Sequence, residues 1–214
     1  MNGVAALLLA FTLVVAVADW IAVQAGVRVV EYVAKPATMV LLIATVVSLD
    51  GVDGFARACV VVALTFSLLG DVFLMLPDGE RWFVAGLGSF LVGHLAYIPG
   101  LWAIGVSAAG LTAGLVVVAV ALATLGRRIV AAVRSTDEAL AVPVTAYIGV
   151  ISAMVVSAAG TLVPVAMAGA ALFNASDALI AWNRFVHERP WGRLAIMVTY
   201  HLGQIGLSLS LLAT

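Results

Sequence analysis

Eight long apolar runs dominate the sequence and leave the chain few possible folds. The runs lie near residues 3–23, 36–49, 55–76, 82–102, 108–125, 139–158, 161–182 and 194–213. The hydrocarbon core of a bilayer is about 30 Å thick, and a helix rises 1.5 Å per residue, so about 20 apolar residues cross it once. We therefore predict an all-α polytopic membrane protein with eight transmembrane helices, in which residues 1–214 form a single domain.

The composition favours the same class of protein. Hydrophobic residues make up 64% of the chain and charged residues 10%, which leaves too little polar surface to cover a water-soluble globule. The net charge of −1 gives no indication of a nucleic-acid partner. A single cysteine, Cys59, rules out a disulfide within one chain and a site built from several thiolates.

The basic residues are sorted by side, and this sorting predicts the topology. Short loops rich in Lys and Arg stay in the cytoplasm. One side of the predicted bundle receives only Arg57, and the other receives Arg28, Lys35, Arg81, Arg127, Arg128, Arg134, Arg184, Arg189 and Arg193. We predict both termini outside. The heavy use of Ala and Val is typical of a GC-rich bacterial genome, which favours a bacterial inner membrane.

A faint internal repeat divides the eight runs into two sets of four. The longest polar stretch, residues 126–138, separates the sets. Asp71 ends the third run and His94 lies in the fourth, while Asp177 ends the seventh run and His201 lies at nearly the same separation in the eighth. Two sets of four helices have the same orientation, so we predict a parallel repeat about an axis along the membrane normal.

Polar side chains within the apolar runs are the candidate functional residues. A carboxylate in hydrocarbon is costly, so such residues usually face the bundle interior or a water-filled cavity. Asp71 and Asp177 lie at a shared depth, about 9–11 Å inside the cytoplasmic ends of their runs by helical rise. The fifth and sixth runs carry almost no polar residue beyond Tyr147, so we interpret them as scaffold and Tyr147 as a packing residue. The other candidates are Asp19, His94, Asn174, Tyr200, His201 and Gln204.

Four separated motifs carry a resemblance to a known family. They are Glu31 to Met39, Leu68 to Met75 with Phe83 to Tyr97, Gly169 to Ala181, and Thr199 to Gln204. In this order they resemble the YhhN-like membrane proteins, whose animal members are lysoplasmalogenases, and together they cover most of the chain. His201 departs from the family pattern, which more often has tyrosine there, so no role is carried over to it.

The resemblance implies an eight-helix enzyme that hydrolyses the vinyl-ether bond of lysoplasmalogens. Its products would be a fatty aldehyde and a glycerophospho head group, its substrate a lysophospholipid, and it would need no cofactor and no metal. Asp71 and Asp177 are the expected catalytic pair. Residues expected to orient the carboxylates or bind substrate are His94, Asn174, Tyr200, Gln204, Lys35 and Asp19. Arg81 and Arg184 are candidates for holding a phosphate, as bidentate donors at the cytoplasmic rim.

The chemistry of the bond agrees with two carboxyl groups. Vinyl-ether hydrolysis begins with proton transfer to the β-carbon, and water then attacks the resulting oxocarbenium ion. Two aspartates in one poorly hydrated site are expected to share a proton, which leaves one acid and one base. Glycoside hydrolysis follows a similar logic. The residues do not decide which aspartate donates.

Two other functions compete with this interpretation. A metal-dependent lipid hydrolase could use Asp71, Asp177, His94 and His201 as zinc ligands, although their predicted depths differ. A proton-coupled transporter could also use intramembrane acids and a four-plus-four repeat. Broken helices would favour the transporter, and Pro99 is the main proline in the interior of a run.

Overall fold

The computed structural model describes residues 1–77 and 79–214, and these residues form helices and no strands. The α-helices are α1 (Gly3–Ala25), α2 (Arg28–Val47), α3 (Gly54–Met75), α4 (Glu80–Ile104), α5 (Ala108–Ala121), α6 (Arg127–Thr136), α7 (Ala141–Gly160), α8 (Pro164–Phe185) and α9 (Gly192–Leu209). A π-helical turn, η1 (Leu122–Gly126), joins α5 to α6, and two 3₁₀ segments are η2 (Glu138–Leu140) and η3 (Ser210–Ala213).

Within the described residues, eight helical segments are long and apolar enough to cross a membrane. The fifth of them, Ala108–Thr136, combines α5, η1 and α6. The prediction of an all-α protein with eight spanning helices is therefore confirmed.

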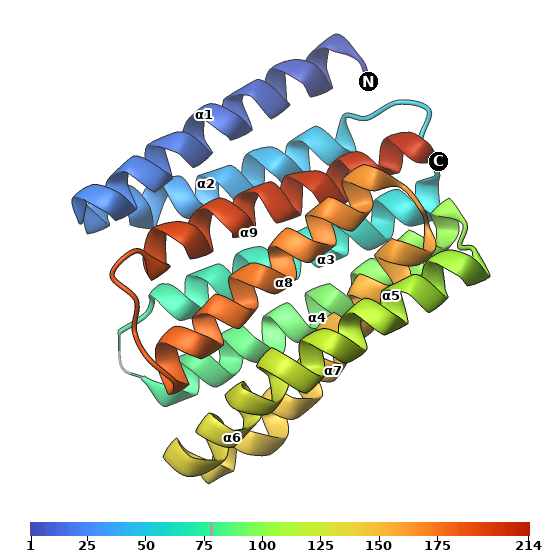
Figure 1. The fold of residues 1–214 in the computed structure, drawn as a ribbon. Helices are drawn as coiled ribbons and strands as arrows, with labels where there is room; N and C mark the ends of the chain where they lie inside the picture. Colours follow the sequence, from blue (N-terminus) through green and yellow to red (C-terminus); the bar gives the residue numbers. More distant parts are fainter. Residues whose placement is uncertain (78) are drawn as a thin grey trace.

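The helices form a bundle of roughly antiparallel neighbours (Figure 1). Successive spans pack as the pairs α1 with α2, α3 with α4, α5 with α7, and α8 with α9. Helix α9 also contacts α1, α2 and α3, so it is the most buried span. Helix α5 lies at the edge of the bundle and packs mainly on α7.

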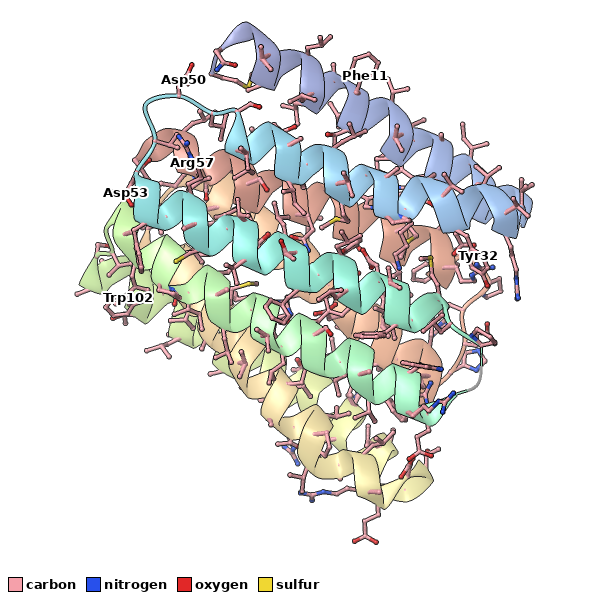
Figure 2. All side chains as sticks on the ribbon, turned by 180° about the vertical axis from the view of Figure 1, so that it is seen from behind. Phe11, Tyr32, Asp50, Asp53, Arg57 and Trp102 are labelled. Atoms are coloured by element: carbon pink, nitrogen blue, oxygen red, sulfur yellow. The ribbon has the colours of Figure 1, made fainter. Side chains whose placement is uncertain are left out.

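Both chain ends lie at one end of the bundle, which we call the terminal end (Figure 1). There Asn2 donates hydrogen bonds to Ser48 and Asp50, and the amide of Asp53 donates to Thr214. Asp50, Asp53 and Arg57 mark the same end in Figure 2, and Tyr32 lies toward the opposite one. An even number of spans requires this arrangement. The opposite end carries most of the arginines and is called the basic end below.

Helix α2 begins eight residues before the start predicted for the second run. The prediction used Lys35 and Pro36 as its boundary, but both lie inside the helix. Spanning helices tolerate proline because neighbouring helices and local adjustments satisfy the freed backbone groups. Lys35 is 6% exposed, so it is an intramembrane cation and not a loop residue.

The polar stretch 126–138, expected to be a connection, is largely helical. Ile129 and Val133 of α6 are buried against α7 and α8, whereas Arg127, Arg128 and Arg134 are exposed. This amphipathic pattern explains why a charged segment extends the fifth span.

Glycines hold α8 and α9 in close contact at Gly169 and Gly203. A Cβ atom at Gly203 would lie 2.7 Å from the backbone nitrogen of Phe173, and one at Gly169 would lie 2.6 Å from that of Leu207. Small residues let transmembrane backbones approach closely. This contact fixes Phe173 of α8 beside Tyr200 of α9, with 5.5 Å between their ring centres.

Candidate active site

Asp71 of α3 is buried and both of its oxygens are engaged. The Lys35 Nζ atom lies 3.0 Å from Oδ1, and the Tyr200 hydroxyl donates a hydrogen bond to Oδ2 at 2.6 Å. The Asp71 side chain is only 1% exposed. Three helices, α2, α3 and α9, therefore meet at this ion pair.

Asp177 of α8 has a different set of partners, and both act on one oxygen. The Tyr147 hydroxyl donates to Oδ2 at 2.5 Å, and His94 Nε2 lies 3.1 Å from the same atom. His94 Nε2 and the Tyr147 oxygen are also 2.9 Å apart. Oδ1 of Asp177 has no partner among the described residues. The Asp177 side chain is 9% exposed, so it is less enclosed than Asp71.

The two carboxylate clusters take their partners crosswise. His94 lies in the span after that of Asp71, but it contacts Asp177. Tyr200 lies at the equivalent place in the span after that of Asp177, but it bonds Asp71. A twofold-like axis along the membrane normal would produce this exchange. The parallel repeat stays a prediction, now with Tyr200 in the position first given to His201.

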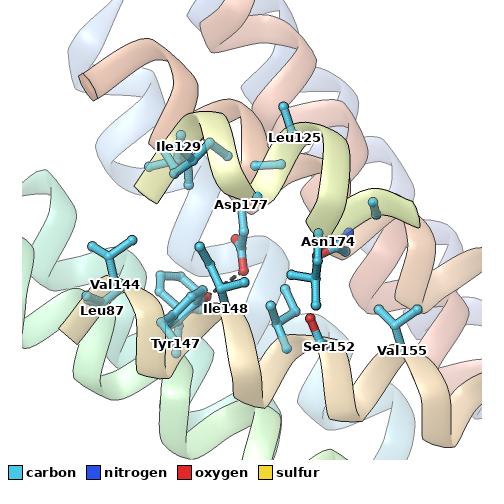
Figure 3. A pocket seen from close by; sticks show the side chains of 18 of the residues that line it. Leu87, Leu125, Ile129, Val144, Tyr147, Ile148, Ser152, Val155, Asn174 and Asp177 are labelled. Carbon is cyan, nitrogen blue, oxygen red and sulfur yellow. Dashed lines mark hydrogen bonds between the residues drawn. The ribbon is translucent and has the colours of Figure 1, made fainter. Parts of the chain in front are cut away.

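A pocket lies beside Asp177 and is enclosed by α4, α5, η1, α6, α7 and α8. Its lining is almost entirely apolar. Asp177, Tyr147, Asn174 and Ser152 supply its polar side chains (Figure 3). Asp71 does not line it.

The pocket is long, and α5 and η1 form its outer wall. On α7 its lining runs from Val144 to Val155, which is about 16 Å of helix. On the outer side it is bounded by Val118 of α5 and by Leu122 and Leu125 of η1. The two leucines are more than one-third exposed, so this wall borders the surface that faces lipid.

Arg184 stands at the basic end of the pocket. Its guanidinium carbon lies 3.8 Å from the ring centre of Phe83, and both Phe83 and the neighbouring Phe185 line the pocket. Arg81 instead stacks on Trp82, at 4.8 Å, and Trp82 is not a lining residue. Of the two arginines considered for a phosphate, Arg184 is therefore the one beside the pocket.

Two other predicted residues, Gln204 and Asn174, make no hydrogen bond to either carboxylate among the described residues. Gln204 accepts a hydrogen bond from Tyr97, at 2.5 Å, so its side-chain oxygen is held by Tyr97. Asn174 lines the pocket one turn from Asp177.

Asp19 of α1 and His201 of α9 do not line the pocket. Both are fully buried, and neither oxygen of Asp19 has a partner among the described residues. Lys35 pairs with Asp71 and not with Asp19. His201 Nδ1 accepts a hydrogen bond from Trp20 at 3.0 Å.

The structure bears on three further expectations. Within the described chain no hydrogen bond joins Asp71 to Asp177; Asp71 pairs with Lys35 and Tyr200, and Asp177 pairs with Tyr147 and His94. Tyr147 was predicted to be a packing residue, but its hydroxyl also donates a hydrogen bond to Asp177. The fifth and sixth spans likewise line the pocket and are more than scaffold. In the sequence, the isolated position of Tyr147 within an apolar run was the one feature that could have indicated a polar partner for it.

The zinc ligands considered from the sequence are not brought together. His94 belongs to the Asp177 cluster, whereas His201 bonds Trp20. Over residues 1–77 and 79–214, no three His, Cys, Asp or Glu side chains are close enough to hold a metal ion.

The fold and the site define a polytopic helical membrane protein with two intramembrane aspartates, one of them at an apolar pocket. The chain belongs to the YhhN family, whose sequence model matches residues 30–211. No solved structure gives a significant match.

Similar proteins carry the name lysoplasmalogenase. Lysoplasmalogenase TMEM86B of Rattus norvegicus is 37% identical over 150 residues, covering 70% of this chain and 60% of the relative. The human TMEM86B protein is 33% identical over 153 residues, covering 70% and 62%. The lysoplasmalogenase of Mycobacterium tuberculosis is 37% identical over 138 residues, covering 62% and 52%. The chain thus spans between half and two thirds of the length of these relatives.

Proposed function

We propose that this protein is a membrane-embedded hydrolase that cleaves the vinyl-ether bond of lysoplasmalogens. The products are a fatty aldehyde and a glycerophospho head group. The observation that carries the proposal is Asp177 on the wall of an apolar pocket, with Tyr147 and His94 both at Oδ2 and no hydrogen-bond partner at Oδ1 among the described residues. The names of the relatives support the substrate class.

The reaction follows from the position of the proton. With two donors on Oδ2, the acid form of Asp177 carries its proton on Oδ1. This proton moves to the β-carbon of the vinyl ether, the double-bond electron pair forms the new C–H bond, and the α-carbon becomes an oxocarbenium carbon. Water adds to the α-carbon and returns a proton to Asp177. The hemiacetal then releases aldehyde as the glycerol oxygen takes the hydroxyl proton.

The pocket accommodates the substrate in one direction. Arg184 lies two helical turns beyond Asp177, about 10 Å along α8, which suits a phosphate separated from the ether by the glycerol unit. The guanidinium is a bidentate partner for phosphate oxygens. The alkenyl chain then extends toward Val118 and Val155, away from the basic end.

Orientation in the membrane is part of the proposal. Lys35 is buried within α2 and is left out of the count of loop residues. Of the nine arginines, only Arg57 lies on one side, and the other eight lie on the opposite side. By the positive-inside rule this places the basic end in the cytoplasm and both termini outside, in a bacterial inner membrane. Asp71 and Asp177 would then lie in the cytoplasmic half of the bilayer.

Purified protein in detergent tests the function directly. Incubation with lysoplasmenyl and lysophosphatidyl lipids should release aldehyde from the first and no fatty acid from the second. Release of fatty acid would replace the proposal with an esterase. Uptake of lipid into proteoliposomes driven by a pH difference, without bond cleavage, would replace it with the transporter.

A further inference from the structure

The two aspartates differ in what they leave free for chemistry. Asp71 has a cation on one oxygen and a hydroxyl donor on the other, and its side chain is 1% exposed. A proton on either oxygen would displace one of these partners. Asp177 has both of its partners, Tyr147 and His94, at Oδ2, and it lines the pocket.

Aromatic rings separate Asp71 from the pocket. The ring of Tyr200 packs edge-on against Phe90, with 5.9 Å between centres, and against Phe173 at 5.5 Å. Phe90 lines the pocket, and Phe173 contacts the ring of His94 at 4.6 Å. All three aromatic side chains, Phe90, Phe173 and Tyr200, are buried.

Through these packing contacts, Asp71 is linked to the pocket wall and to Asp177. Asp71 fixes the hydroxyl of Tyr200, and the ring of Tyr200 supports Phe90 at the pocket wall. Phe173, beside Tyr200, supports His94, which bonds Asp177. A shift of Tyr200 would therefore move both the wall and the donor that holds Asp177.

We propose that Asp71 is a positioning residue, held as the counter-ion of Lys35, and that Asp177 alone exchanges protons with the substrate. This inference rests on the proposed hydrolase function and assigns unequal roles to its two aspartates. Lys35 is then an internal counter-ion and does not hold the phosphate of the lipid.

The energetics of a buried ion pair make the proposal testable. Removing one partner leaves an uncompensated charge and is strongly destabilising, whereas replacing both partners by neutral residues is often tolerated. Asn at position 71 would still accept the hydrogen bond of Tyr200 through its amide oxygen. A carboxyl that transfers protons has no such neutral substitute.

The experiment is a double-mutant cycle on the full-length protein. Asp71→Asn and Lys35→Met should each lower kcat by about tenfold or more because each leaves one charge unpaired. The Lys35→Met/Asp71→Asn double variant should regain at least about tenfold over the weaker single variant and should recover its thermal unfolding temperature. The charge-reversed double, Lys35→Asp/Asp71→Lys, provides a second version of the same test.

The matched control is the Tyr147→Phe/Asp177→Asn double variant, which changes a carboxyl and its partner in the other cluster. It should be no more active than Asp177→Asn. The inference is overturned if both Lys35/Asp71 doubles fold but stay at the activity of Asp71→Asn, or if neither double folds. Aldehyde release by the unmutated protein is measured in parallel. If the unmutated protein releases no aldehyde, the proposed function is contradicted. If it is active but both double variants are inactive, only the role given to Asp71 is contradicted.

Discussion

The hydroxyl of Tyr147 donates a hydrogen bond to Oδ2 of Asp177, with 2.5 Å between the two oxygens. This bond joins α7 to α8 at the pocket wall (Figure 3), and the second oxygen of Asp177 makes no hydrogen bond with the described residues. A span that was expected to be scaffold therefore orients the carboxyl that we propose to be the acid.

Asp177→Asn tests the proton donor. It keeps the volume of the side chain but removes its proton, and general acid–base catalysis typically contributes about 10²–10⁴-fold. We expect kcat for aldehyde release to fall by at least about 100-fold, with an unfolding temperature close to that of the unmutated protein. A loss smaller than tenfold in a folded variant would contradict the role.

Tyr147→Phe tests the orientation of Asp177. The substitution keeps the ring and removes one hydrogen bond to a carboxyl, worth about 1.5 kcal/mol, so kcat should fall about tenfold. Tyr32→Phe is the control, since Tyr32 is 47% exposed and far from the pocket. Equal activities of the two variants would show that the hydrogen bond has no part in turnover.

Val118→Phe tests the direction of the alkenyl chain. The larger ring would fill the end of the pocket remote from Arg184, so kcat/KM should fall for long alkenyl chains and stay unchanged for short ones. Val117→Phe, on the neighbouring residue, is the matched control because Val117 is 63% exposed and does not line the pocket. A uniform loss over all chain lengths would argue against this orientation of the substrate.

Arg184→Gln tests the phosphate site. Without the guanidinium, KM for a lysoplasmenyl phospholipid should rise several-fold with kcat nearly unchanged, because uniform binding is lost. An alkenylglycerol that lacks the phosphate should show no such difference between the two proteins. If KM rises equally for both lipids, Arg184 acts through its stacking on Phe83.

Single cysteines test the orientation in the membrane. In a background in which Cys59 is replaced, Ser135→Cys should resist a membrane-impermeant thiol reagent in intact cells, and Asp53→Cys should react. Both positions are exposed, and Ser135 belongs to α6, which lies at the opposite end of the bundle from Asp53 (Figures 1 and 2). The reversed pattern of labelling would place the basic end outside.

Sequence reasoning reached the number of spans and the two intramembrane aspartates because hydropathy and isolated carboxyls can be read along the chain. It placed His94 among the residues that orient a carboxylate, and the structure puts His94 on Asp177. The pairing of Lys35 with Asp71 was missed, because a basic residue before a proline resembles the end of a span. Partners across spans depend on how each helix is rotated about its axis, and hydropathy does not contain that rotation.

The peripheral position of α5 has a consequence for how the substrate arrives. The pocket borders lipid at the wall formed by α5 and η1, and α5 packs mainly on α7. Under the proposed function, a lysolipid already in the bilayer reaches Asp177 by moving sideways and never needs to leave the membrane. The turnover of such an enzyme is governed by the mole fraction of the lysolipid among its neighbouring lipids, so diluting the substrate with inert lipid at constant bulk concentration should slow it.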